Sequence, residues 1–445
     1  MKVSVMGTGY VGLVTGVCLA EHGFDVVCVD IDSAKVDRIN QGQAPFHEPG
    51  LDEMLARHAG QSLRATVDAA GAIQSTDLTL IAVGTPFDGQ HIDLTYIKES
   101  AKTVGRAIAN KDGYHVVVVK STVVPGTTDS VVLPILERES GKVAGKDFGV
   151  GMNPEFLTEG EAIGDFMEPD RIVLGGIDER TQNALDALYA SFEGAPRIRT
   201  NNSTAEMIKY ASNSLLATLI SFSNELANLG AAVGNIDAVD VMRGLHLSRY
   251  LSPIENGKRV EPSIVSFLMP GCGFGGSCLP KDVSALVAYG RDRGVPMDIL
   301  SSALAINSRQ TDEVFRLLGR HFDSLHGKTV SVLGLAFRPD TNDMRQSPAI
   351  PIIDRLLAEG AVVHAYDPAA MNEAKHRFPS DVKFCPTLAA ALEEPDAIVL
   401  VTRWKEFLGV PALLEKRKRS PAPVLIDGRR LLDATSVERY EGIGR

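Results

Sequence analysis

The chain has 445 residues, and its 44% hydrophobic and 23% charged residues are typical of a folded globular protein of about three domains. The formal net charge is −11, and the lysines and arginines are scattered and form no long basic block, so nucleic acid is a poor candidate partner. An anionic small molecule is compatible with this charge, because local cations and helix N-termini can bind phosphate.

In the first part of the chain, short apolar runs alternate with helix-like segments. The runs that we expect to form strands are Val3–Met6, Asp25–Val29, Leu78–Val83, His115–Val119 and Arg171–Leu174. This alternation predicts a parallel α/β sheet. The first run begins almost at the first residue and leaves no room for a secretory signal, which favours a cytoplasmic location.

A glycine-rich turn follows the first expected strand. Gly7 permits the tight turn, Gly9 lets the backbone approach a pyrophosphate, and Gly12 allows close packing of the following helix. Asp30 closes the next strand, where its carboxylate would bind the ribose hydroxyls and repel a 2′-phosphate. Strand, turn, helix and distant acid together predict a site for NAD, in preference to NADP.

The middle of the chain begins with Ser203 and Glu206 at the spacing of a capping box, and good helix formers continue to about Gly230. A helix of this length spans roughly 40 Å at 1.5 Å per residue. Its apolar stretch 214–234 contains polar residues such as Asn224, which argues against a membrane span and for a buried helix. We expect a long central helix that connects the outer domains and offers a surface for a homodimer.

Four glycines and two cysteines occupy the eight positions from Gly271 to Cys278. Glycine allows close backbone approaches, which suits a loop that folds tightly against a ligand. Cys278 lies near Lys281 and just before a helical run, and both a cation and a helix N-terminus favour the nucleophilic thiolate. We therefore expect a reactive cysteine, whereas burial as a small hydrophobic residue is the usual state of a free cysteine.

The five cysteines are odd in number, and none has the C-x-x-C spacing of a zinc site, so we expect reduced thiols and no metal. A disulfide between Cys272 and Cys278 is the alternative, although cytoplasmic proteins seldom keep such bonds. Burial is the expectation for the other cysteines, namely Cys18, Cys28, Cys272 and Cys385.

A second set of apolar runs follows in the last third of the chain. These expected strands are Thr329–Leu333, Ala361–Tyr366, Asp396–Val401 and Pro423–Ile426. The first of them ends at Gly334 as the opening strand ends at Gly7, and Asp367 follows the second as Asp30 does, which suggests a duplicated domain. The full glycine fingerprint is absent after Gly334, so we expect no second dinucleotide.

The predicted fold class is α/β, with two Rossmann-like parallel-sheet domains joined by a long central helix and a small helical domain. We expect an NAD-binding domain over residues 1–200, a central helical dimerisation domain over 201–310 and a second Rossmann-like domain over 311–445.

Five segments of the sequence resemble one known family. They are Gly7–Leu13, Glu48–Leu51, Asn153–Gly160, Gly271–Asp282 and Ile426–Arg429. The chain resembles, over essentially its whole length, the UDP-glucose dehydrogenase branch of the nucleotide-sugar dehydrogenases, which oxidise a sugar C6 alcohol to a carboxylate. The resemblance implies NAD as the cofactor and a nucleotide sugar as the substrate, and it makes 311–445 the UDP-sugar-binding domain.

The resemblance also assigns residues to the site. Around the cofactor it places Gly7, Gly9, Tyr10, Val11, Gly12, Asp30, Lys35, Thr85, Pro86, Thr122, Glu159, Lys281 and Arg345. Around the substrate it places Glu155, Phe156, Leu157, Glu159, Lys209, Asn213, Arg249, Phe267, Leu268, Gly271, Gly275, Phe337, Arg338 and Arg429. The expected catalytic residues are Cys278, Lys209, Asn213, Asp282, Glu155, Glu159 and Thr122.

The chemistry implied by these residues is a four-electron oxidation. After the alcohol becomes an aldehyde, the Cys278 thiolate would attack it, and a second oxidation would leave a thioester that water hydrolyses. Lys209 and Asn213, at i and i+4 on one helix face, would stabilise the oxyanions. This scheme predicts two NADH for each sugar acid.

The acids of the site have less definite expected roles. Asp282 would position water or tune the neighbouring lysine, and either Glu155 or Glu159 would act as base. Arg338 and Arg429 would grip the substrate diphosphate, and Arg345 would reach the cofactor. The family usually has lysine at the position of Arg338, and an arginine fork is not equivalent to an ammonium at a phosphate.

Two segments bear on the substrate and the subunit contacts. Residues 248–266 form a longer segment than we expect and suggest an inserted loop, in which Arg249 matches an arginine that reaches the neighbouring subunit's site in the family. Residues 157–160 and 169–171 resemble the UDP-glucose branch, whereas 247–250 resemble the GDP-mannose branch. UDP-glucose is the favoured substrate, with GDP-mannose and N-acetylated UDP-sugars as alternatives.

Two other classes of function compete with this prediction. In a two-electron hydroxyacid dehydrogenase, Lys209 and Asn213 would carry the chemistry and Cys278 would be structural. In a non-catalytic NAD-binding redox sensor, Cys272 and Cys278 would form a regulatory disulfide. The first explains neither the last domain nor the glycine-rich loop.

Overall fold

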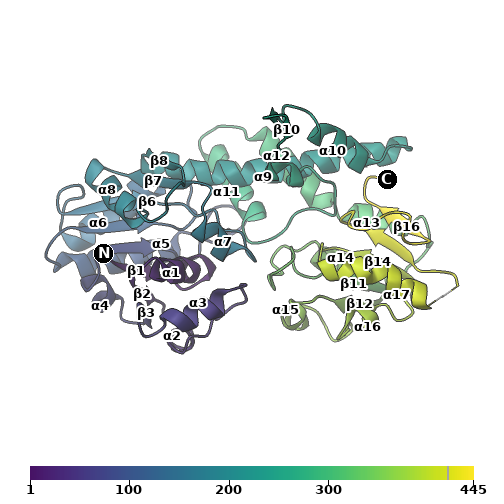
Figure 1. Ribbon diagram of the computed structural model, residues 1–445, viewed down its shortest axis with the longest axis horizontal. Helices are drawn as coiled ribbons and strands as arrows, with labels where there is room; N and C mark the ends of the chain where they lie inside the picture. Colours follow the sequence, from purple (N-terminus) through teal and green to yellow (C-terminus); the bar gives the residue numbers. More distant parts are fainter. Residues whose placement is uncertain (418–419) are drawn as a thin grey trace. The chain divides into compact units, whose positions relative to one another are not determined.

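The computed structural model describes residues 1–417 and 420–445. The chain divides into two compact units, Met1–Ser212 and Asn213–Arg445, and each contains its own sheet (Figure 1). Within the described residues, no helix is both long enough and apolar enough to cross a membrane.

The first unit is built on an eight-stranded sheet with the strand order β3-β2-β1-β4-β5-β6-β7-β8. Its strands are β1 Lys2–Met6, β2 Asp25–Val29, β3 Leu63–Thr66, β4 Leu78–Ile81, β5 His115–Val119, β6 Phe148–Met152, β7 Ile172–Gly176 and β8 Arg197–Thr200. Neighbours pair in parallel, as predicted, except that β6 and β7 are antiparallel. Residues 153–171 connect these two strands and return the chain in the opposite direction.

Helices cover both faces of this sheet, which explains why a central strand such as β5 is buried along its whole length. The helices are α1 Tyr10–Glu21, α2 Ser33–Asn40, α3 Leu51–His58, α4 Ala69–Gln74, α5 Thr95–Ala109, the π-helical turn Thr128–Val132, α6 Leu133–Ser140, α7 Ala162–Met167 and α8 Glu179–Leu188. One hydrophobic cluster packs α1, α2, α3, α7 and α8 on one face, and a second packs α4, α5 and α6 on the other.

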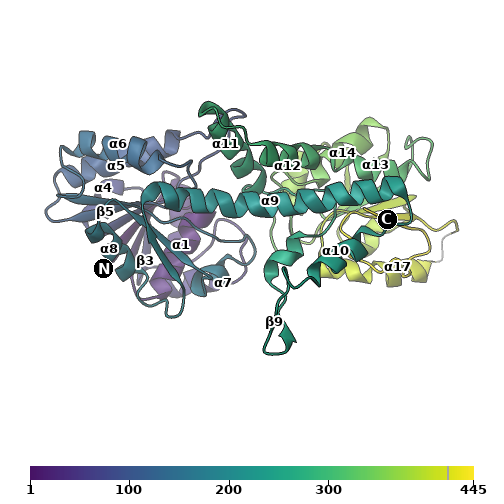
Figure 2. The same cartoon turned by 90° about the horizontal axis from the view of Figure 1, so that it is seen from above.

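The predicted long central helix is present as α9, Asn202–Val233, whose 32 residues span about 48 Å (Figure 2). The predicted capping box is wrong. The Thr204 N–H is capped by the Asn201 side chain at 2.8 Å. The Glu206 carboxylate, fully buried, accepts hydrogen bonds from the Gly126 N–H and from the N–H and hydroxyl of Thr128. Three such donors satisfy a buried carboxylate better than the helix N-terminus would.

The second unit continues α9 into a group of helices. These are α10 Ala238–His246, the 3-10 turn Ser263–Phe267, α11 Leu279–Asp292, α12 Asp298–Arg309 and α13 Asp312–Leu318. The longer segment 248–266 contains a β-hairpin, with β9 Ile254–Glu255 and β10 Lys258–Arg259. Asn256 and Gly257 turn it with positive φ angles of 49° and 76°, which is why an Asn-Gly pair occurs there.

The second unit also contains a six-stranded, fully parallel sheet with the strand order β13-β12-β11-β14-β15-β16. The strands are β11 Thr329–Leu333, β12 Val362–Tyr366, β13 Lys383–Phe384, β14 Ala397–Leu400, β15 Val424–Asp427 and β16 Tyr440–Gly442. Its helices are α14 Ala349–Ala358, α15 Met371–Arg377, α16 Leu388–Ala391, the 3-10 turn Lys405–Gly409 and α17 Val410–Arg417. The order repeats that of β3, β2, β1, β4, β5 and β6, so the predicted pair of Rossmann-like sheets is confirmed.

Candidate functional site

The turn between β1 and α1 leaves an open space beside its backbone. Gly7 has a φ of +95°, and a Cβ on Gly12 would lie 1.9 Å from the Gly7 carbonyl oxygen, so neither position accepts a side chain. A Cβ on Gly9 would meet nothing within 4 Å, and Gly9 is exposed. Because α1 begins at Tyr10, the positive end of its dipole lies at this space, which suits a phosphate group.

Asp30 lies beside the same turn. Its Oδ2 accepts hydrogen bonds from the Thr8 N–H at 2.9 Å and the Thr8 hydroxyl at 2.5 Å, and its Oδ1 accepts one from the Asp32 N–H at 3.0 Å. Burial acts to raise the pKa of Asp30, but these hydrogen bonds and the Lys35 charge outweigh it and lower that pKa. The carboxylate is therefore ionised and partly exposed, as a ribose hydroxyl would require.

Thr85, Pro86 and Thr122 lie in the two loops that follow β4 and β5. The Thr85 hydroxyl donates to the Thr122 carbonyl at 2.8 Å and joins the loops. Because β1, β4 and β5 are parallel neighbours, both loops lie at the same edge of the sheet as the Gly7–Gly12 turn.

A buried ion pair lies past the end of β6. Lys209 Nζ is 3.0 Å from Glu155 Oε1, and both side chains are about 5% exposed or less. The Leu157 N–H donates to Glu155 Oε2 at 2.6 Å, and Lys209 Nζ lies 5.6 Å from the Phe156 ring centre. Burial acts to raise the pKa of Glu155, but Lys209 and the Leu157 N–H outweigh it and lower that pKa. Glu155 is thus a carboxylate in an almost dry environment.

Cys278 lies in the second unit at the N-terminal boundary of α11. All five cysteines fall in described residues, where Cys278 is partly exposed and the other four are buried free thiols, as expected. One turn further on, the almost fully buried Asp282 accepts hydrogen bonds from Lys281 and Asn213, each at 2.6 Å. Asp282 therefore gathers two expected site residues beside the helix N-terminus that carries the thiol.

The glycine-rich loop 271–278 packs so closely that side chains would not fit. A Cβ on Gly275 would lie 2.2 Å from the Gln346 carbonyl oxygen, and one on Gly276, whose φ is +87°, would lie 2.7 Å from the Phe337 ring. The Gly276 N–H donates to the Arg345 carbonyl at 2.9 Å. The loop is thus held against the carboxyl end of β11, the edge at which such sheets bind ligands.

Three models of one family match the chain: the NAD binding domain over residues 1–193, the central domain over residues 203–309 and the UDP binding domain over residues 331–434. The chain is also 42% identical over 448 residues to the UDP-glucose 6-dehydrogenase of Haloferax volcanii, with the full length of both proteins covered. The chain belongs to the UDP-glucose/GDP-mannose dehydrogenase family.

Other members of the family show the same similarity. The chain is 40% identical over 375 residues to the GDP-mannose 6-dehydrogenase of Pseudomonas syringae pv. tomato, covering 82% of this chain and 81% of that protein. The solved structure of a UDP-glucose dehydrogenase from Pyrobaculum islandicum matches with a TM-score of 0.90 and 36% identity, covering 100% of this chain and 97% of that one. The family and the oxidoreductase class predicted from the sequence are confirmed.

The family's NAD binding domain identifies NAD as the cofactor, and the residues of the first unit fit it. The open space at Gly9 admits a pyrophosphate, and the start of α1 supplies a positive dipole. Asp30 is an ionised carboxylate that would accept hydrogen bonds from ribose hydroxyls and would repel the 2′-phosphate of NADP.

The three arginines that were predicted for the site in the last domain differ in their contacts. Arg429 donates to the carbonyls of Val401 at 2.6 Å and Gly273 at 2.8 Å, so it anchors the glycine-rich loop. Arg345 binds Asp343 through two nitrogens. Arg338 is partly buried in the turn after β11.

The remaining predicted residues of this unit lie before the glycine-rich loop. Phe267 ends the 3-10 turn, and the carbonyl of Leu268 lies 2.9 Å from His246 Nε2. Arg249 is exposed on the segment between α10 and β9.

Two buried charges of the first unit were missed by the sequence analysis. Lys120 Nζ, 3% exposed, donates to Asn153 Oδ1 at 3.0 Å, and burial lowers its pKa to about 8. Glu48 is a buried carboxylate that binds Tyr10. A lysine directly after the fully buried strand β5 was the available signal for Lys120. Glu48 was noted only within a segment shared with the family.

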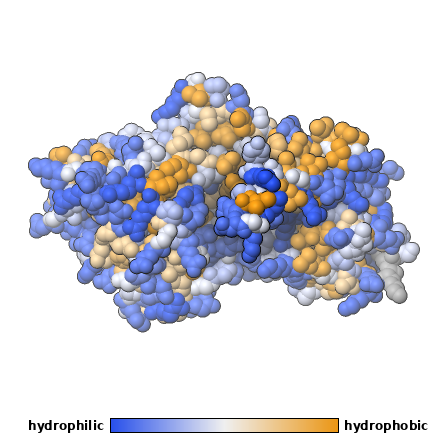
Figure 3. Space-filling view, turned by 45° about the horizontal axis from the view of Figure 1, so that its top comes forward, coloured by the Kyte–Doolittle hydropathy of each residue, from blue (hydrophilic) through white to orange (hydrophobic). Residues whose placement is uncertain are grey.

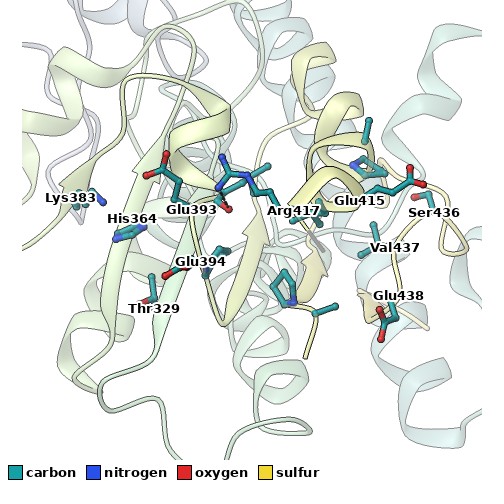
Figure 4. Close-up of a pocket in the computed structure, with 17 residues that line it drawn as sticks. Thr329, His364, Lys383, Glu393, Glu394, Glu415, Arg417, Ser436, Val437 and Glu438 are labelled. Atoms are coloured by element: carbon teal, nitrogen blue, oxygen red, sulfur yellow. Dashed lines mark hydrogen bonds between the residues drawn. The ribbon is translucent and has the colours of Figure 1, made fainter. Parts of the chain in front are cut away.

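A depression of about 1250 Å³ lies elsewhere in the second unit, at the amino ends of β11, β14 and β15 (Figure 4). Four carboxylates line it, against one lysine, one arginine and one histidine: Glu393, Glu394, Glu415, Glu438, Lys383, Arg417 and His364. Its acidic lining and its place opposite the ligand-binding edge of the sheet make it a poor site for a nucleoside diphosphate.

Proposed function

We propose that this chain oxidises the C6 alcohol of UDP-glucose to a carboxylate, with two NAD reduced for each product. The observation that carries the proposal is the partly exposed Cys278 thiol at the start of α11, on a loop held against the carboxyl end of β11. Relatives named UDP-glucose 6-dehydrogenase, at 39–42% identity over the full chain, support this substrate.

The Cys278 thiol takes part in the second oxidation, from the aldehyde to the acid. NAD, when bound, accepts the two electrons that each oxidation removes. Cys278 Sγ attacks the aldehyde carbon to give a thiohemiacetal, and oxidation converts this to a thioester. Water then cleaves the thioester, so that the sugar leaves as a carboxylate and the thiol is restored.

The polar residues of the site handle charge and protons. The Lys209 ammonium and the Asn213 amide stabilise the oxyanions that form when sulfur or water attacks the carbonyl carbon. Glu155, ionised beside Lys209, and Glu159 on the same loop are the candidate bases. Asp282 fixes the amide of Asn213 and thereby its orientation.

The catalytic part of the proposal is tested with Cys278→Ser and the matched control Cys385→Ser, which alters a buried cysteine. We expect Cys278→Ser to bind NADH normally and to form no sugar acid, and the control to yield two NADH per UDP-glucuronate. Unchanged turnover of Cys278→Ser would favour a two-electron dehydrogenase, and no turnover by wild type with any nucleotide sugar would favour an NAD sensor.

GDP-mannose is the second candidate substrate, because GDP-mannose 6-dehydrogenases are 40% identical to this chain over 375 residues. Initial rates of NADH formation with UDP-glucose, GDP-mannose and UDP-N-acetylmannosamine separate the candidates. We expect UDP-glucose to have a kcat/KM at least tenfold higher than the others, and a higher value for GDP-mannose would reassign the substrate.

We also propose that the protein is a homodimer and that each chain has three domains, 1–200, 201–310 and 311–445. Apolar residues recur along α9 at alternating intervals of four and three residues, a pattern that is typical of the contact face of a coiled coil. They are Leu215, Leu219, Phe222, Leu226, Leu229 and Val233. Leu229 and Val233 are 60% and 66% exposed, and hydrophobic side chains are visible on the face that carries α9 (Figure 3). A second copy of the helix would remove this surface from water.

Analytical ultracentrifugation tests the dimer. We expect wild type to sediment as a dimer at micromolar concentration, and a Phe222→Asp/Leu229→Asp double variant to sediment as a monomer. Exposed apolar residues of the first unit, such as Val67, provide the control, since Val67→Asp should remain dimeric. A monomeric wild-type protein would remove the dimer from the proposal.

A further inference from the structure

Glu48 connects two parts of the first unit that are far apart in the sequence. It lies in the loop between α2 and α3 and is 5% exposed. Its Oε2 accepts hydrogen bonds from the Tyr10 hydroxyl and from the Gly160 N–H, the latter at 2.7 Å, and its Oε1 accepts one from the Ala162 N–H at 2.7 Å. One carboxylate therefore binds both the cofactor turn and the loop that carries Glu155 and Glu159.

The cofactor side of this connection is Tyr10, the first residue of α1 and part of the glycine fingerprint. Its ring packs on Phe46 with the ring centres 5.3 Å apart, and its hydroxyl lies 3.1 Å from the Gly160 nitrogen. Burial and the neighbouring Glu48 carboxylate raise the pKa of Tyr10, so the phenol remains a protonated donor. A ligand that fixes the start of α1 also fixes this donor.

The substrate side is the segment 155–162. Helix α7 begins at Ala162, and its own N-cap residue, Glu161, makes no capping hydrogen bond with its side chain. Glu48 supplies that cap from 114 residues away, and a carboxylate is favourable at the positive end of a helix. The segment has a second anchor, the 2.8 Å hydrogen bond from the Thr158 N–H to Asp165. The Tyr10 hydroxyl also donates to the Thr158 carbonyl, at 3.4 Å. Asp165 lies on α7, so a change at Asp165 removes the second anchor but keeps the Tyr10 and Glu48 hydrogen bonds, and provides a matched control.

We propose that Glu48 is a positioning residue through which NAD binding and the conformation of the 155–162 loop are coupled, so that cofactor and nucleotide sugar bind with positive cooperativity. The inference rests on the proposed function, because it takes the 155–162 loop as a substrate-binding element. Removing the Glu48 hydrogen bonds would leave each ligand able to bind but without effect on the other. By reciprocity, NAD must tighten sugar binding by the same factor by which sugar tightens NAD binding.

The coupling is measured by calorimetry with NADH and UDP-glucose, a pair that cannot react. For wild type we expect the Kd of UDP-glucose to fall about fivefold or more when NADH is saturating, within the usual range of such couplings. The coupling ratio is the Kd of UDP-glucose without NADH divided by its Kd with saturating NADH. This ratio should fall to about one in Glu48→Gln and in Tyr10→Phe, which keeps the Glu48 cap on α7. The Kd for NADH alone should change by less than about threefold in Glu48→Gln, and the melting temperature of Tyr10→Phe should be close to wild type.

Asp165→Asn should weaken UDP-glucose binding with and without NADH, leaving the ratio as in wild type. A wild-type ratio of one, or a ratio that Tyr10→Phe and Glu48→Gln both leave unchanged, would overturn the coupling. A wild-type protein that binds NADH but not UDP-glucose would instead overturn the proposed substrate, so the two failures are distinguishable.

Discussion

The two sheets of this protein share a strand order and differ in how the turn after the first strand is used. In the first unit, Gly9 is exposed and has nothing within 4 Å of a Cβ position. In the second, Gly334 is followed by Leu335 and Ala336, and all three are buried. The same topology therefore leaves the backbone of this turn accessible in one unit and fills the corresponding space with side chains in the other.

The acid that follows the second strand shows the same contrast. Asp30 is partly exposed and receives three hydrogen bonds, from Thr8 and Asp32. Asp367 is 1% exposed and receives five, from the Trp404 ring and from four backbone N–H groups: Leu335, Ala336, Ala369 and Ala370. The comparison predicts that an acid at this position binds a ligand only when the turn beside it leaves hydrogen-bonding capacity unused.

The largest expected effect is on stability, in Asp367→Ala. This change would leave four buried donors and one part-buried donor without their acceptor. Each unsatisfied buried group costs about 1–3 kcal/mol, so we expect a loss of at least about 4 kcal/mol in the free energy of unfolding. Urea unfolding measures it, and NADH fluorescence titration should give a wild-type Kd. A weakened Kd in the folded variant would contradict the structural role assigned to this acid.

The buried histidines of the two sheets should respond differently to acid. His115 in β5 is 1% exposed, and burial lowers its pKa from 6.5 to about 3, whereas burial and Lys383 lower the pKa of His364 in β12. A lowered folded-state pKa favours folding above pH 6.5, and this stability is lost as pH falls toward 3. We expect His115 to account for a loss of about 2 kcal/mol between pH 6.5 and pH 5.

Urea midpoints at those two pH values, for wild type, His115→Gln and the control His364→Gln, measure this effect. The pH dependence should become shallower in His115→Gln and change less in His364→Gln. Equal slopes for wild type and His115→Gln would show that His115 does not govern the acid sensitivity of the first unit.

Asp30→Ala is the counterpart of the change at Asp367 and should affect binding. We expect NADH to bind about 10- to 30-fold more weakly, or about 1.4–2 kcal/mol, because hydrogen bonds from ribose to a charged acceptor are lost. Discrimination against NADPH should fall as well, since the carboxylate that repels its phosphate is removed. A melting temperature several degrees below wild type, with NADH affinity unchanged, would mean that Asp30 serves the fold as Asp367 does.

The smallest expected effect is in Thr8→Val, which removes the hydroxyl that donates to Asp30 at 2.5 Å but keeps the backbone hydrogen bond at 2.9 Å. This hydrogen bond orients the Asp30 carboxylate toward the cofactor. We expect its loss to cost about 1 kcal/mol of binding free energy, or roughly fivefold in the Kd for NADH. Thr8→Ser restores the hydroxyl and should restore the affinity. Equal affinities for Val and Ser at this position would remove the hydroxyl from the site.

The strands that could be predicted were those with apolar runs, such as β2 and β5, in which four consecutive residues are apolar. The strands that were not predicted include β6, which alternates with glycine, β8, which is largely exposed and carries two arginines, and β13, which has two residues. Their sequences carry too little apolar periodicity, and pairing with a neighbouring strand is what makes them strands.

The site divides in the same way. The Gly7–Gly12 turn with Asp30 and the glycine-rich loop with Cys278 were predictable, because glycine spacing and a cysteine before a helix are local patterns. The Glu155–Lys209 ion pair and the Lys120–Asn153 hydrogen bond join residues from separate elements. No local pattern in the sequence indicates such partners.

By itself, the sequence determined the family, the NAD fingerprint, the duplicated α/β pattern and the cysteine, since each is encoded by neighbours along the chain. Only the tertiary structure decided that Asp367 and Glu206 hold the fold and that Glu48 joins the cofactor turn to the 155–162 loop. A buried carboxylate must be satisfied by donors, and those donors come from wherever the folded chain brings N–H and hydroxyl groups within reach.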